Sequence, residues 1–164
     1  MRFIFVLVVL VSAIGCSGSG NDLPIREYHA TVQPLMVENE ALADKFIELA
    51  IQIKQENIPG EEVARKLESD LIPHAQGLRA KASSINLGQN ELGQVHAILV
   101  NAWTLRAAAY KQMVEAYEQS DTQIFDNALS NNNNSKSSEE TYFSEVNRYF
   151  ATKGLRLIQF PKGG

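Results

Sequence analysis

The chain has 164 residues, with 15 Lys and Arg against 19 Asp and Glu, and a formal net charge of −4. This mild acidity, without any basic block, argues against nucleic-acid binding. Cys16 is the only cysteine, so no disulfide can form within the chain. The roughly 140 residues of the region expected to fold behind it are enough for one hydrophobic core.

Residues 1–15 have the pattern of a secretory signal peptide. Arg2 supplies a positive charge, residues 3–11 form an unbroken apolar run, and small residues follow. The run is too short to span a bilayer, which takes roughly 20 apolar residues. We therefore expect residues 1–15 to direct export.

The sole cysteine follows this segment directly, behind Ala13, Ile14 and Gly15. This arrangement resembles a bacterial lipoprotein signal, although the commonest version has Leu where Ala13 stands. The resemblance implies that the Cys16 thiol carries a diacylglycerol, with chains such as palmitate, and that Cys16 anchors the protein to a membrane. The alternatives are a plain secretory signal with an unrelated cysteine, or an apolar helix start in a cytosolic protein.

Residues 16–22 are expected to form the lipidated cysteine and a flexible tether, because Ser-Gly-Ser-Gly-Asn-Asp has no apolar surface to bury. Ser17, rather than Asp, follows the cysteine. In a host with two membranes, the lipoprotein resemblance then implies the outer membrane, with the protein facing the periplasm.

The first helical region begins at Leu23. From Ile25 to Ile53, apolar residues and Asn39 recur in steps of three and four, which places them on one stripe of a helix. Pro34 lies inside this stripe and predicts either a kink or a short first segment followed by a longer one. A break is expected at residues 58–60.

A second helix is expected behind Pro59, which suits a first helical turn, and Pro73 is expected to interrupt it. Residues 86–90, with Gly88, end it. The third helix, about Glu91 to Gln119, has the widest apolar face in the chain.

Ser120 and Asp121 predict the boundary and cap of a fourth helical region. The run Asn131 to Ser138 is rich in Asn and Ser, which compete with the helix backbone for hydrogen bonds, so we expect a mobile loop there. Helix should resume at Glu139 and stop at Gly154, before a short extended end at 155–160 and a tail at 161–164.

These patterns predict an all-α protein, an antiparallel four-helix bundle with kinked helices, formed by a single domain over residues 23–160. Eight residues are expected in its core: Leu42, Phe46, Leu49, Leu67, Leu71, Leu99, Leu105 and Met113.

Three polar residues interrupt the apolar stripes and form a possible buried polar site: Asn39, His74 and Arg106. Histidine can bind a metal or move a proton, a buried Asn can fix helix register, and Arg can pair with a carboxylate or an anionic ligand. Each residue also has an ordinary structural interpretation, as a hydrogen-bonded side chain or one that reaches the surface.

The third helix also carries an aromatic edge with a seven-residue spacing: His96, Trp103, Tyr110 and Tyr117. Aromatic residues in excess of core packing are typical of binding surfaces, so this edge is a possible face for a protein partner or ligand. The other interpretation is that these residues belong to the core.

No Glu-x-x-His pair, covalent-haem motif, phosphate loop or Gly-x-Ser-x-Gly motif occurs. We therefore expect no metal, no cofactor and no enzyme activity. The sequence favours a non-catalytic binding, accessory or scaffold lipoprotein of the cell envelope, with a protein partner. The alternative is a bundle that binds a small ligand or a cofactor.

Overall fold

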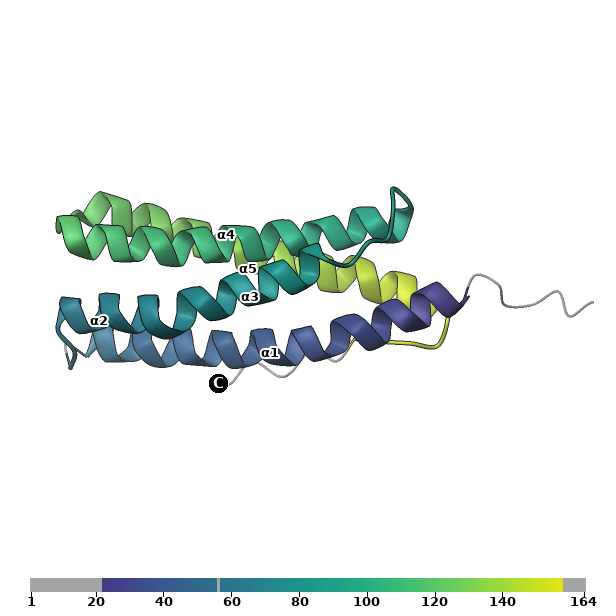
Figure 1. Ribbon diagram of the computed structural model, residues 1–164, viewed down its shortest axis with the longest axis horizontal. Coiled ribbons are helices and arrows are strands. Elements are labelled where there is room, and N and C mark those ends of the chain that lie inside the picture. The colour runs from purple at the N-terminus through teal and green to yellow at the C-terminus, as the bar shows by residue number, and fades with distance from the viewer. Residues whose placement is uncertain (1–21, 56, 158–164) are drawn as a thin grey trace, which may run out of the picture.

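The computed structural model describes residues 22–55 and 57–157, so the signal segment, Cys16 and residues 17–21 of the tether lie outside the described residues. The described part is all-α: α1 (Asp22–Lys54), α2 (Gly60–Lys66), the π-helical turn η1 (Leu67–Leu71), α3 (Ile72–Ser83), α4 (Glu91–Gln119) and α5 (Thr122–Ala151). Because α2, η1 and α3 follow one another without a gap, they form one arm, and the chain makes the predicted antiparallel four-helix bundle (Figure 1).

α1 contains the predicted stripe and runs through Pro34 without a break. The expected separation into two segments is therefore wrong, while a kink at Pro34 stays a prediction. The stripe faces the interior, and seven of its members are buried: Ile25, Tyr28, Val32, Leu35, Asn39, Leu42 and Leu49.

In the second arm, the helix changes its winding just before Pro73. A proline has no N–H to donate, and in an α-helix its ring would clash with the carbonyl of Ser69, four residues earlier. Ser69 lies inside the wider π turn η1, and α3 then begins with Pro73 in its first turn. The arm thus continues past the proline, and Leu67, Leu71 and Leu78 still face the core.

The connection between α4 and α5 is short and follows the prediction. Ser120 ends α4 in the left-handed conformation, with φ of 54°. The Asp121 side chain then accepts hydrogen bonds from the backbone N–H groups of Gln123 and Ile124. This cap satisfies two of the donors that the start of a helix leaves without an intrahelical partner.

The predicted loop at Asn131 to Ser138 is wrong, because α5 is continuous from Thr122 to Ala151. Ser135 is completely buried, and its Oγ donates to the Ala102 carbonyl at 2.7 Å. Asn131 donates to Gln112 on α4 at 2.8 Å. Contacts with α4 therefore outweigh the weak helix propensity of the asparagine run.

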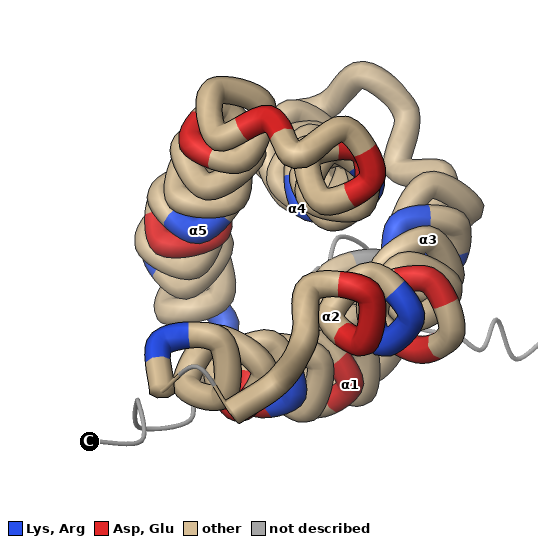
Figure 2. Tube along the Cα trace, turned by 90° about the vertical axis from the view of Figure 1, so that its left-hand side faces the viewer, with Lys and Arg blue, Asp and Glu red and all other residues tan. Residues whose placement is uncertain are grey.

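Seen along its axis, the bundle has the arms in the order α1, α3, α4, α5 (Figure 2). α4 and α5 pack along each other, and α4 also contacts α2, η1 and α3, whereas α1 and α5 have little backbone contact. Six of the eight expected core residues are buried; Phe46 is half-buried against the core, and Leu105 is half-buried outside the core cluster.

Behind α5 the chain folds back onto the bundle. Gly154 has a φ of 65°, and Leu157 is fully buried. The Leu157 N–H donates to Asn147 Oδ1 at 2.7 Å, and His29 Nε2 donates to the Arg156 carbonyl at 3.0 Å. These contacts attach the end of the described chain to α5 and α1.

No helix in residues 22–55 and 57–157 is both long enough and apolar enough to cross a bilayer.

Candidate functional site

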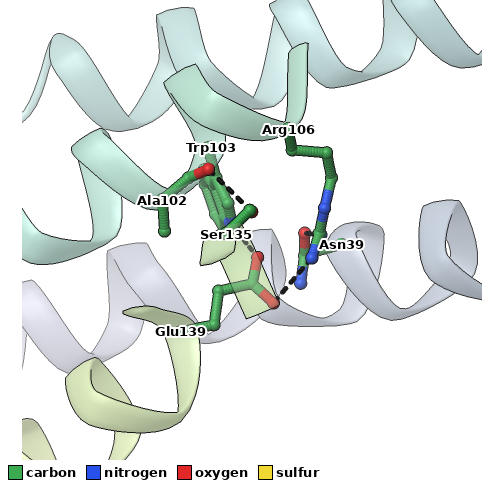
Figure 3. A network of polar contacts seen from close by, with 6 residues as sticks. All are labelled: Asn39, Ala102, Trp103, Arg106, Ser135 and Glu139. Carbon is green, nitrogen blue, oxygen red and sulfur yellow. Dashed lines mark hydrogen bonds and ion pairs between the residues drawn. The ribbon is translucent and has the colours of Figure 1, made fainter. Parts of the chain in front are cut away.

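A cluster of polar side chains lies in the middle of the bundle, on three helices (Figure 3). Asn39 comes from α1, Trp103 and Arg106 from α4, and Ser135 and Glu139 from α5. We call these five residues the central polar cluster. All of them are buried.

The Glu139 carboxylate is the centre of this cluster. Arg106 Nη2 donates to Oε2 at 2.9 Å, and Trp103 Nε1 donates to Oε1 at 2.6 Å. Arg106 also donates through Nη1 to Asn39 Oδ1. Each oxygen of the buried carboxylate thus has a donor, which offsets the cost of removing the charge from water.

The charges of this cluster act on groups around it. Burial raises the pKa of Tyr110 to about 12; Arg106 opposes this shift and Glu139 adds to it. Burial also raises the pKa of Glu40, and the nearby carboxylates of Asp44 and Glu139 raise it further.

A second group of hydrogen bonds joins all four arms. Tyr28 on α1 lies with its hydroxyl 2.7 Å from the Tyr142 hydroxyl on α5 and 2.9 Å from His96 Nδ1 on α4. His96 Nε2 lies 2.9 Å from the carbonyl of Ala82 on α3. We call these four residues the tyrosine–histidine chain.

The direction of each hydrogen bond in this chain follows from the Ala82 carbonyl at one end. The Ala82 carbonyl can only accept, so His96 Nε2 carries a hydrogen, and the neutral ring accepts from Tyr28 through Nδ1. Tyr28 in turn accepts from Tyr142. Burial lowers the pKa of His96, although the hydrogen bond to Ala82 opposes this shift. Burial also raises the pKa of both tyrosines.

The three residues of the possible polar site lie in different surroundings. The structure brings Asn39 and Arg106 together, whereas His74 is half-buried on α3 and is not part of the central polar cluster. Both interrupted stripes face the same interior, which explains why Asn39 and Arg106 meet.

The aromatic edge belongs largely to the core, which is the second of the two interpretations of these residues. Trp103 and Tyr110 are each 1% exposed, His96 is also buried, and Tyr117 is half-buried. The reason is that α4 packs against both α3 and α5, so it buries two adjacent stripes. Three of the four edge residues are therefore interior, and Tyr117 is the member that stays partly exposed.

Sequence reasoning missed Glu139, Ser135 and the polar roles of Tyr28 and Tyr142. A signal was present, since the buried residues of α5 form one helical stripe: Ala128, Ser135, Glu139, Tyr142, Val146 and Phe150. The expected loop hid this stripe, because it contained Ser135 and separated Ala128 from Glu139.

An apolar pocket of about 190 Å³ lies at the end of the bundle that holds α2, and we call it the end pocket. Every arm contributes to its walls, and the following residues line it: Phe46, Leu49, Ala50, Ile53, Lys54, Val63, Leu67, Met113, Tyr117, Phe125 and Leu129. Burial there raises the pKa of Tyr117, whose ring meets that of Phe125 edge-on at 5.6 Å.

These sites differ in what they can do chemically. The donors and acceptors of the central polar cluster bind one another across helices, so its geometry serves helix pairing. Within the described residues, no group of three or more His, Cys, Asp or Glu side chains is placed to hold a metal ion. The end pocket, by contrast, offers a concave apolar surface to a ligand.

No family model, no curated protein and no solved structure matches this chain.

Proposed function

We propose that this chain is an exported, lipid-anchored binding protein of the cell envelope, without catalytic activity of its own. The observation that carries the anchoring is the apolar run that ends at Ala13-Ile14-Gly15-Cys16. The binding role needs a scaffold that holds its surface in one shape. The two buried hydrogen-bond groups support this, because they connect the arms of the bundle to one another.

The experiment is membrane fractionation of cells that express the wild-type chain or Cys16→Ser, together with labelling by a radioactive fatty acid. Wild-type protein should sediment with membranes and carry the label. Cys16→Ser should be released or remain unprocessed, without label. Ser12→Ala is the matched control, since it changes a nearby residue and keeps the thiol. Identical fractionation of wild type and Cys16→Ser, with no label in either, would contradict the proposal.

Within this function, we favour binding of a small ligand over capture of a protein partner. The specific observation is the end pocket, which is concave and has walls from all four arms. The aromatic edge, which was the reason to expect a protein partner, lies in the core. Extraction of the purified protein with organic solvent, followed by mass spectrometry, should reveal a bound apolar compound.

A further inference from the structure

We infer that the end pocket binds the alkyl chain of a single-chain anionic amphiphile, a fatty carboxylate of roughly eight carbons. This inference rests on the proposed function, because it names the ligand class of the same binding protein.

The size of the pocket selects one short chain. An apolar protein cavity of about 150 Å³ binds benzene, which has six carbons, so 190 Å³ holds a chain of roughly seven or eight carbons. Octanoate has seven carbons behind its carboxylate. Sites for drug-sized ligands have about 300–1,000 Å³, so haem, a sterol or a two-chain lipid exceeds this pocket.

The walls select an apolar chain. Aliphatic side chains come from α1, α2 and η1, and include Leu49, Val63 and Leu67. α4 and α5 contribute Met113 and Leu129, respectively. Such walls offer almost no hydrogen-bond partner to a polar ligand, whereas they can cover every methylene of an alkyl chain.

The charge at the pocket selects the head group. Lys54, in the last turn of α1, is exposed and is the one charged residue among the described residues that line the pocket. Its ammonium group is therefore placed to pair with a carboxylate that stays in water while the chain is buried.

The surroundings of the pocket also favour an amphiphile. Ala50, a lining residue, is exposed, and its neighbours Ile47 and Ile51 are 54% and 49% exposed. At this end of the bundle, α5 lies away from α1 (Figure 2). Apolar side chains in water beside a pocket provide a surface on which an alkyl chain can first settle.

The position of the pocket favours a free amphiphile over a membrane lipid. It lies at the end of α1 that is remote from the anchoring segment, and the 33 residues of α1 span roughly 50 Å.

The test is calorimetric titration of the full-length protein, reconstituted in phosphatidylcholine vesicles, with hexanoate, octanoate, decanoate and 1-octanol. Vesicles without protein provide the blank. If fractionation shows no anchor, the soluble protein is titrated without vesicles, so that failure of the anchor and failure of the pocket are distinguished.

Octanoate should bind once per chain. Each methylene removed from it should weaken binding about fourfold, since a buried CH₂ contributes about 0.8 kcal/mol and 1.4 kcal/mol corresponds to a factor of ten. Decanoate should gain little over octanoate, because the pocket is then full. A gain that continues with chain length would indicate partition into vesicles and would overturn the inference, as would the absence of octanoate binding.

Two matched pairs of variants locate the site. Ala50→Trp at the pocket should weaken octanoate binding more than tenfold, whereas Ala41→Trp, also at an exposed alanine of α1, should leave it unchanged. Lys54→Gln should weaken octanoate binding up to about fivefold and leave 1-octanol unaffected, as expected of an exposed ion pair. Lys111→Gln is its control on exposed α4 surface.

Circular dichroism checks that each variant folds. If Ala50→Trp unfolds, the inference is tested by the chain-length series and by the comparison of Lys54→Gln with Lys111→Gln. Octanoate binding that none of these pocket variants changes would overturn the assignment.

Discussion

Arg106 and Glu139 form an ion pair inside the bundle, with Nη2 and Oε2 2.9 Å apart and the two side chains only 7% and 11% exposed. The pair connects α4 to α5 in the middle of both helices. Since the second carboxylate oxygen accepts from Trp103, Glu139 has no position to which it can rotate without losing a donor. The pair therefore specifies the register of α5 on α4.

Replacing Glu139 by Gln should destabilise the protein by about 3–5 kcal/mol, because Arg106 is left buried without its counter-charge. The amide also has only one oxygen for two donors. Urea unfolding followed by circular dichroism measures the loss. Glu118→Gln, on an exposed part of α4, is the control and should change stability by less than about 0.5 kcal/mol.

The double variant Arg106→Met with Glu139→Leu separates the cost of the unpaired charge from the cost of the lost hydrogen bonds. An apolar pair often replaces a buried ion pair at no cost, so the double variant should recover part of the loss, while Trp103 Nε1 and Asn39 Oδ1, left without these partners, keep it below wild type. A double variant as unstable as Glu139→Gln would mean that the lost hydrogen bonds, and not the unpaired charge, dominate the loss.

Much of the fold is predictable because steps of three and four place residues on one side of a helix. This holds for α1, where the stripe from Ile25 to Leu49 is buried, and for the cap at Asp121. It fails in α5, since the burial of Ser135 and Glu139 depends on partners on α4 that are far away in the sequence.

The candidate site is predictable only in part for the same reason. Asn39 and Arg106 were visible as interruptions of apolar stripes, but a stripe does not say which polar residues meet. The end pocket was not predictable, because it depends on how α5 lies relative to α1 at one end of the bundle.

Deletion of Asn133, an exposed residue in the asparagine run, should abolish cooperative unfolding or lower the free energy of unfolding by several kcal/mol. One residue corresponds to a rotation of about 100° in a helix, so Glu139 and Tyr142 would leave the interior. Asn133→Ala is the control and should raise stability by a few tenths of a kcal/mol, because Ala has the higher helix propensity. Unchanged thermal unfolding of the deletion would show that this segment is a loop.

Stability should fall as the pH drops below about 6.5, the ordinary pKa of histidine. Because the pKa of His96 is lowered in the folded protein, the unfolded chain binds the proton first, and stability rises with pH in this window. The slope for one histidine is at most about 1.4 kcal/mol per pH unit, and it ends below the folded pKa.

Burial of His96 is the main physical reason for this pH dependence, and the hydrogen-bond directions of the tyrosine–histidine chain act in the same sense. A proton on His96 Nδ1 forces Tyr28 to donate to Tyr142, which then loses the acceptor of its own hydroxyl hydrogen. Urea unfolding at pH 5, 6, 7 and 8 measures the effect. His96→Gln should remove this contribution, whereas His74→Gln, outside the chain, should keep it. Equal slopes in wild type and His96→Gln would rule out His96 as the source.

Asn132→Leu should stabilise the protein by about 1–2 kcal/mol. Asn132 Oδ1 is buried without a hydrogen-bond partner among the described residues, and such a group costs about 1–3 kcal/mol. Leucine has a similar shape, no polar atom and a better helix propensity. Asn134→Leu, at an exposed position of the same helix, is the control for propensity and should give only a few tenths of a kcal/mol. Thermal unfolding of the two variants measures the gain in stability of each. An equal gain in both would show that the oxygen of Asn132 has a hydrogen-bond partner in solution.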